Sequence, residues 1–204
     1  MTRDSMGVDQ TRLGLIDAFC VVASRDLTRY PSVVAVVKEA GCNRATFYRY
    51  FEDIFALNAS MEDVVISHIA QKLAQFAPTH FKHQGLMDAF VSLDDCYHDY
   101  LVVLFSPLYC AHFEVKLKGA VAPVFAKFSG CDITQPREAV LLDMFFSAVL
   151  ANVSRFIRDG ATLERQEIVA LNRSLLTQWL IPQLQACKVA VDGCEGIATP
   201  PLIG

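Results

Sequence analysis

Apolar residues recur at three- and four-residue steps through most of this 204-residue chain. Such spacing places their side chains along one side of an α-helix. A first helix carries a stripe made of Leu13, Ile16, Cys20, Ala23 and Leu27. A long fourth helix, ending before Pro78, carries another made of Met61, Val64, Val65, Ile69 and Leu73. The sequence therefore predicts an all-α fold.

The segment from Pro31 to Phe51 is punctuated as two short helices. Pro31 suits a first helical turn, because its missing N–H would have no partner there, and the buried side then consists of Val33, Val34, Val36 and Val37. A strand is the rival interpretation of this valine run. Gly41 favours a helix that ends in a left-handed residue, and Asn43 can cap the next helix. This order predicts a helix-turn-helix, whose second helix enters the major groove in DNA-binding proteins.

The predicted second helix of this unit, "RATFYRYF", has two chemically different sides. Phe47 and Phe51 are four residues apart and would be buried, with Ala45 small enough to face inward. The side chains left for the groove are Arg44, Thr46, Tyr48, Arg49 and Tyr50. Arginine can donate two hydrogen bonds to guanine, threonine offers a hydroxyl and a methyl, and tyrosine reaches phosphate oxygens. The alternative is the solvated side of an ordinary amphipathic helix.

Charge is distributed unevenly along the chain. The formal net charge is -4, yet residues 1–50 hold seven Lys or Arg against five acids. A mildly basic head on an acidic body fits a protein whose contacts with a polyanion are confined to one end.

The span from about Thr11 to Leu57 resembles the DNA-binding domain of TetR-family bacterial transcriptional regulators. "AGCNRATFYRYFEDIFAL" is similar to that family's "AGVSxxTFYRYFxSKExL" signature. The resemblance implies a three-helix head, a connecting fourth helix, and a ligand-binding, dimerising helical body. It also implies DNA contacts by Thr46 and Tyr48, the latter at the backbone. The chain departs from the signature at Ile54, where the family usually has a lysine, and in "RDLTRYPS", where Arg29, Tyr30 and Ser32 could restore backbone contacts.

The expected organisation has three parts. Residues 1–53 form the helix-turn-helix domain, 54–187 a helical effector-binding and dimerisation domain, and 188–204 a disordered tail. In the body we expect a helix stopped by Pro107, breaks at Gly119 and Pro123, a helix from Pro136 to Arg158 that stops at Gly160, and another from near Thr162. Two long terminal helices suit the seam of a homodimer, and the alternative is that the first of them is central in a monomeric core.

Aromatic residues gather in the expected body. Ten of the 14 phenylalanines lie beyond residue 75. An apolar pocket for a small hydrophobic or aromatic effector could be lined by Phe90, Tyr97, Leu101, Phe105, Tyr109 and Phe113. The same residues could equally be core. The family resemblance implies that an effector favouring one arrangement of the body lowers DNA affinity by linkage.

Other classes of protein have weaker support. There is no phosphate-binding glycine loop, nucleophile elbow or HExxH, and Asp94 with His98 reads as an exposed helical pair, so we expect no enzyme. The pairs Cys96/His98, Cys110/His112 and His80/His83 offer ligand types at short spacing, but a C-x-H pair on a helix places its side chains on divergent sides, so we expect no metal or other cofactor. The N-terminus lacks the features of a signal peptide, and the uncharged runs are shorter than a bilayer span, which predicts a cytoplasmic protein that avoids membranes.

These observations together predict a homodimeric transcriptional regulator that binds a palindromic double-stranded DNA operator and responds to a small molecule. The family resemblance implies that it is a repressor. Two alternatives remain at this stage. The regulator could lack a small-molecule ligand and act through a protein partner, or it could sense metal or redox state through its seven cysteines.

Overall fold

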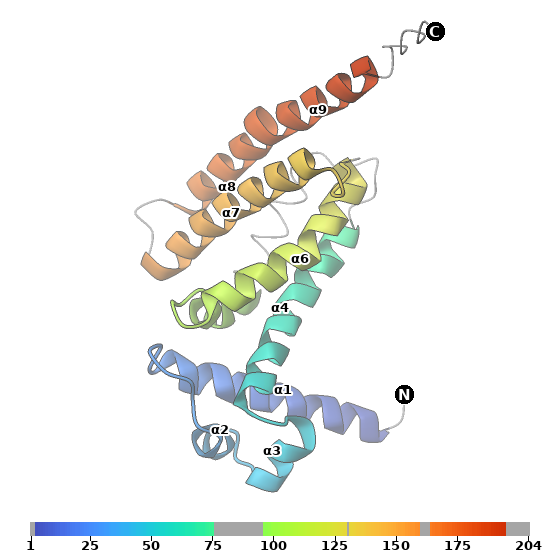
Figure 1. The fold of residues 1–204 in the computed structure, drawn as a ribbon. Helices are drawn as coiled ribbons and strands as arrows, with labels where there is room; N and C mark the ends of the chain where they lie inside the picture. Colours follow the sequence, from blue (N-terminus) through green and yellow to red (C-terminus); the bar gives the residue numbers. More distant parts are fainter. Residues whose placement is uncertain (1–2, 76–95, 130, 160–163, 195–204) are drawn as a thin grey trace, which may run out of the picture.

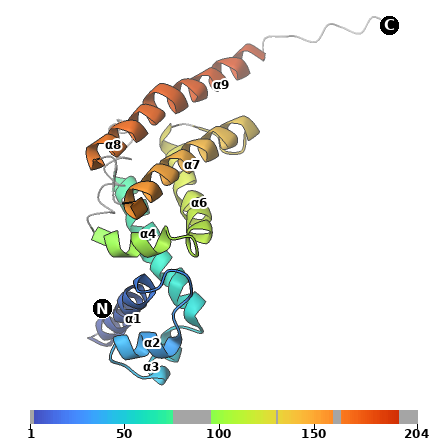
Figure 2. The ribbon, with the colours of Figure 1, turned by 90° about the vertical axis from the view of Figure 1, so that its left-hand side faces the viewer.

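The computed structural model describes residues 3–75, 96–129, 131–159 and 164–194, and every regular element within these ranges is a helix. Figure 1 shows helices α1 to α3 at one end of the molecule, α4 rising from them, and α6 to α9 packed at the other end. Figure 2, a quarter turn away, shows the same separation into a head and a body. The predicted all-α class is confirmed for this part of the chain.

The head consists of α1 (Arg3–Ser24), α2 (Val33–Glu39) and α3 (Arg44–Tyr50). The core side of α1 is formed by Leu15, Ile16, Phe19, Cys20 and Ala23. Leu13 was expected on this stripe, but its side chain is 43% exposed, because residues 15, 16, 19, 20 and 23 set the buried direction. Phe47 from α3 and Val36 from α2 are fully buried and close this small core.

Helix α2 begins at Val33, slightly later than the sequence predicted. Ser32 caps it by accepting a hydrogen bond from the backbone N–H of Ala35, so Pro31 precedes the helix instead of lying in its first turn. The valine run is helical, as predicted, but only Val36 and Val37 are buried, and Val34 is exposed. A seven-residue helix has one narrow buried side, which cannot hold four valines.

Helix α4 (Ile54–Gln75) connects the head with the body, where it packs against α6 (Cys110–Ser129). The turn before α4 is fixed by Asp53, whose carboxylate accepts a hydrogen bond from the N–H of Ala56 at 2.8 Å. The predicted stripe of α4 is confirmed, with Met61, Val65, Ile69 and Leu73 buried and Val64 partly buried.

Helix α6 runs through two residues that were expected to break it. Pro123 lies inside the helix and Gly119 stands four residues before it. A proline removes one hydrogen bond to the carbonyl four residues earlier, and that carbonyl here belongs to an exposed glycine that water can solvate. The expectation of a break at these positions is therefore wrong. Upstream, the helix over 96–104 does end before Pro107, as predicted.

The remaining helices are α7 (Pro136–Asp159), α8 (Arg165–Ser174) and α9 (Ile181–Cys194). A π-helical turn, η2 (Leu175–Leu180), joins α8 to α9, and the N–H of Ile181 bonds back to the carbonyl of Leu176. Pro182 follows and cannot donate to an α-helical ladder, which explains the local widening. Helix α9 continues to Cys194. Residues 188–194, which were expected to begin a disordered tail, are therefore helical.

One described helix has the length and composition of a membrane span. The segment Pro136–Arg158 has a mean hydropathy of 1.6, and 44% of that window is buried against other helices. The most buried side chains of α7, including Phe145, Val149 and Leu150, belong to the main apolar core. Core helices of soluble proteins pass the same test, so this feature is weak evidence for a membrane protein.

Candidate nucleic-acid interface

The turn between α2 and α3 is built by the two residues that the sequence singled out. Gly41 has a φ of +63°, the left-handed conformation that glycine adopts most readily. Asn43 then caps α3, because its side-chain oxygen accepts a hydrogen bond from the N–H of Thr46 at 2.8 Å. Both predictions for this turn are confirmed, and they fix the angle at which α3 follows α2.

Helix α3 is held down by two phenylalanines. Phe47 is fully buried and Phe51 nearly so, and their ring centroids lie 5.8 Å apart. The guanidinium of Arg12 from α1 lies over the Phe51 ring, at 5.7 Å from its centroid. This packing leaves the opposite side of α3 facing solvent, at the lower end of the molecule in Figure 1.

The solvent-facing side of α3 carries the residues predicted to contact DNA. Arg44, Tyr48 and Arg49 are exposed, and Thr46 and Tyr50 are partly buried. Ala45 is also exposed, so the expectation that it faces inward is wrong. It lies two residues before Phe47, which puts it on a different side of the helix from the buried ring.

Three of these side chains are held in place by neighbours. The Tyr48 ring stands edge-on against Phe47, with centroids 5.3 Å apart, while its side chain remains exposed. The Arg49 guanidinium lies 5.2 Å from the centroid of the Tyr50 ring. The Thr46 hydroxyl donates to the side-chain oxygen of Asn43. The hydroxyl oxygen of Thr46 can still accept a hydrogen bond, and its methyl group can still make apolar contacts.

The approach to α2 supplies further polar groups. The Ser32 hydroxyl oxygen accepts from Ala35, so its proton is available to donate to a phosphate. Arg29 pairs with Asp26 at 2.7 Å. That carboxylate also accepts from the N–H and the hydroxyl of Thr28, hydrogen bonds that lower the pKa of Asp26. A phosphate would therefore have to compete with the Asp26 carboxylate for the Arg29 guanidinium.

The end of α3 is followed by acids. Glu52 and Asp53 are exposed directly after Phe51, and Asp53 is committed to capping α4. Ile54, partly buried, opens α4 at the place where the resemblance leads one to expect a lysine. This corner therefore repels phosphates instead of binding them.

No model of a protein family matches this chain, and no curated protein matches it. The resemblance of residues 11–57 to TetR-family heads therefore rests on the sequence motif.

The residues predicted to line an effector pocket occupy different environments. Leu101, Phe105, Tyr109 and Phe113 are buried, Tyr97 is partly buried, and Phe90 lies outside the described residues. The rings of Phe105 and Phe113 pack edge to face, at 5.4 Å. An effector reaching these side chains would have to displace core packing.

Tyr109 has a role that the sequence did not suggest. Its ring centroid lies 6.3 Å from that of Phe19 in α1 and 4.8 Å from that of Tyr30. The Tyr30 ring packs in turn on Phe55 of α4. Tyr100 adds a hydrogen bond from its hydroxyl to Asp17 of α1. These aromatic and polar contacts join the head to the body, because they connect residues on either side of α4.

Among the surface hollows lined by described residues, three lie between helices. The largest of these three, about 480 Å³, lies between the start of α6 and the end of α7 and includes Glu114, Arg155 and Arg158. One of about 370 Å³ separates α1 from the helix over 96–104, and one of about 300 Å³ lies between α6 and α7 around Pro123. None of these three is lined by the six residues predicted for the effector.

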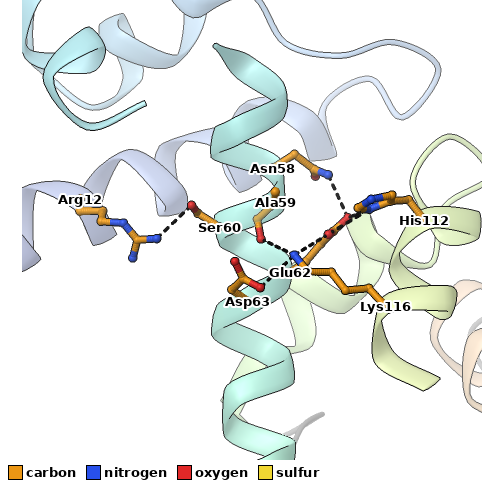
Figure 3. Close-up of polar contacts among 8 residues, drawn as sticks. All are labelled: Arg12, Asn58, Ala59, Ser60, Glu62, Asp63, His112 and Lys116. Carbon is orange, nitrogen blue, oxygen red and sulfur yellow. Dashed lines mark hydrogen bonds and ion pairs between the residues drawn. The ribbon is translucent and has the colours of Figure 1, made fainter. Parts of the chain in front are cut away.

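A polar cluster between α4 and α6 was also missed. Glu62 on α4 is fully buried and is contacted by His112 and Lys116 of α6, as Figure 3 shows. Its partners lie about fifty residues away in the chain, and no local pattern marks the pairing. In the described ranges no three His, Cys, Asp or Glu side chains are grouped so as to hold a metal ion.

Proposed function

We propose that this protein is a DNA-binding transcriptional regulator of the TetR type, with α3 as the helix that enters the major groove. One observation carries the proposal. Two buried phenylalanines, a left-handed glycine and an asparagine cap hold α3 so that Arg44, Tyr48 and Arg49 project together into solvent.

The chemistry of these side chains divides into positioning and readout. Tyr48, Ser32 and Arg29 offer hydrogen-bond donors suited to phosphate oxygens, which fix the protein on the duplex. Arg44 and Arg49 can each donate two hydrogen bonds to a guanine, and the Thr46 methyl can contact a thymine. Arg44 has no ion pair among the residues that the structure describes, so its guanidinium is available for such a contact.

We further propose that the protein acts as a homodimer on a palindromic operator. A head with one seven-residue reading helix contacts few bases, and two heads related by a two-fold axis double the contacts. Helices α7, α8 and α9 lie side by side at the end of the body far from the head, as Figures 1 and 2 show, and they expose Val140, Met144 and Leu171. These helices are the proposed seam.

The body is proposed to respond to a small hydrophobic or aromatic effector and the whole to act in the cytoplasm as a repressor. The supporting observation is the set of contacts by which Tyr109 and Tyr100 join the body to α1. A rearrangement of the body around these residues would change their contacts with α1 and so shift the position of the head. Release of DNA would follow if the effector favours an arrangement in which the heads are out of register.

In vitro selection from a random duplex library tests this proposal. The full chain should enrich a site with two-fold symmetry, and affinity for that site should fall steeply with salt, because lysine and arginine contacts to phosphates release counterions. A folded protein that enriches no sequence, with and without a panel of small aromatic compounds, would contradict it.

A further inference from the structure

The joint between α4 and α6 is closed by a carboxylate that has no contact with solvent. Both Glu62 oxygens are approached by the His112 imidazole, at 2.9 and 3.1 Å, and one of them by the Lys116 ammonium at 3.2 Å. Asn58, one turn earlier on α4, donates to the other oxygen at 3.1 Å. Figure 3 shows these groups converging on Glu62 from two helices.

Lys116 binds α4 at three points. Besides Glu62, its ammonium donates to the backbone carbonyl of Ala59 at 3.1 Å and pairs with Asp63 at 2.9 Å. Burial alone would lower the pKa of Lys116, but the hydrogen bonds to Asp63 and Glu62 and the charges of these carboxylates together outweigh it and raise the pKa overall. The side chain therefore stays charged and clamps one turn of α4, from residue 59 to residue 63.

A charged cluster is an expensive way to hold two helices together. Apolar side chains of similar size would often give equal or greater stability, because a buried ion must first be removed from water. Hydrogen bonds, however, depend on direction, and so they fix how far one helix is rotated and shifted along another. The cluster therefore adds a directional constraint to the one that apolar packing between α4 and α6 already supplies.

The position of the cluster gives this constraint leverage over the head. Glu62 lies nine residues from Asp53, which is about 13 Å along the helix. A tilt of about 10° at Glu62 would therefore move the start of α4 by about 2 Å. The head contacts α4 between its start and Glu62, since Leu57 is buried in the core shared with α1 and Arg12 of α1 donates to Ser60 at 2.9 Å.

We infer that Glu62 is a positioning residue for DNA binding: by fixing the angle between α4 and α6, it sets the separation of the two heads and thus the half-site spacing that the dimer accepts. This inference rests on the proposed function. One added base pair changes the half-site separation by about 3.4 Å and rotates one half-site by roughly a tenth of a turn, a change of the same order as the movement above.

The test compares operators that differ only in spacing. Wild-type protein and Glu62→Gln are titrated with the selected operator, with versions having one base pair added or removed at the centre, and with a single half-site. Glutamine keeps the size of the side chain and removes the charge that His112 and Lys116 approach. The matched control is Lys118→Met, which removes a lysine of α6 that pairs with Asp143 and Ser147 of α7 and does not touch α4.

Wild type should prefer the selected spacing by at least tenfold. Glu62→Gln should lose at least fivefold of that preference while binding the single half-site as wild type does, and Lys118→Met should match wild type throughout. A loss of stability alone would lower all affinities together and would not flatten the spacing profile. An unchanged spacing profile in folded Glu62→Gln would overturn the inference.

Two further variants cover the case in which Glu62→Gln does not fold. His112→Ala and Lys116→Met each remove one of the side chains that contact Glu62, and each should flatten the spacing profile. If both retain the wild-type profile, the inference is wrong. If wild type itself binds no selected duplex, the proposed function fails, and this outcome is distinct from binding with a spacing preference that the cluster does not affect.

Discussion

Tyr48 illustrates how one side chain can be exposed and still well positioned. Its ring rests edge-on against buried Phe47, and its hydroxyl projects from α3. Tyr48→Phe should weaken operator binding about five- to tenfold, because one hydrogen bond to a phosphate contributes about 1 kcal/mol. Binding titrations measure the loss, with Tyr97→Phe in the body as the matched control. Undiminished affinity at an unchanged melting temperature would show that Tyr48 does not touch DNA.

Cys20 shows the opposite case, a reactive group made inert. Burial in the head raises the pKa of its thiol to about 12, and the carboxylates of Asp99 and Asp17 add to this. Because the thiolate is the nucleophile, Cys20 should react with iodoacetamide at pH 8 far more slowly than exposed Cys96. Peptide mapping over time measures both rates, and urea should abolish the difference. Equal rates in native protein would contradict the packing described for α1.

Single residues were predictable where their partners are local. Phe47 and Phe51, with Gly41 and Asn43, all act within one or two turns of chain, and their burial, turn or capping role was predicted from spacing. Glu62 and Tyr109 were missed because their partners are supplied by other helices. A lone acid or tyrosine in an apolar run carries no local sign of such a contact.

At the scale of the element, replacing either of two glycines by alanine should change the free energy of unfolding in opposite directions. An added Cβ meets nothing within 4 Å at either Gly41 or Gly119, so packing plays no part in either substitution. Gly41→Ala forces an alanine into a left-handed conformation and should lower the free energy of unfolding by about 1 kcal/mol. Gly119→Ala lies inside α6 and should raise it by about 0.5–1 kcal/mol. Urea unfolding measures both, and equal signs would contradict the turn geometry.

The start of α3 followed the sequence, whereas the start of α2 and the course of the chain at the prolines departed from it. Ser32, Asn43 and Asp53 start their helices through side-chain hydrogen bonds. Pro123 was expected to end a helix and instead lies within α6, and Pro182 accompanies a π-helical turn that no apolar spacing predicted. Tertiary packing decides such cases, since a long helix buried on one side tolerates the loss of one hydrogen bond.

At the scale of the whole molecule, the proposed dimer depends on α7 and α8. Met144 is about half exposed on α7, one turn after exposed Val140, on the surface assigned to the seam. Met144→Glu should convert the dimer to a monomer, because a charge there must be removed from water on association. Sedimentation velocity measures the change. Val115→Glu, at an exposed position of α6, is the matched control and should leave the assembly unchanged.

That assignment fails if wild type sediments as a monomer at micromolar concentration, or if Met144→Glu sediments as wild type does. The sequence located the two long helices of this region but could not say which of their sides faces outward, because apolar residues crowd more than one side of α7. The structure distinguishes the sides, with Phe145, Val149 and Leu150 inward and Val140 and Met144 outward.

The central claim is that α3 reads bases, and Arg44 tests it most directly. The measurement is the base preference at every operator position for wild type and Arg44→Ala, with Arg155→Ala, an exposed arginine of the body, as the matched control. The account predicts that Arg44→Ala loses its preference at one base pair in each half-site, by about 1–3 kcal/mol, and keeps the rest. A uniform loss across all positions, or no loss, would contradict it.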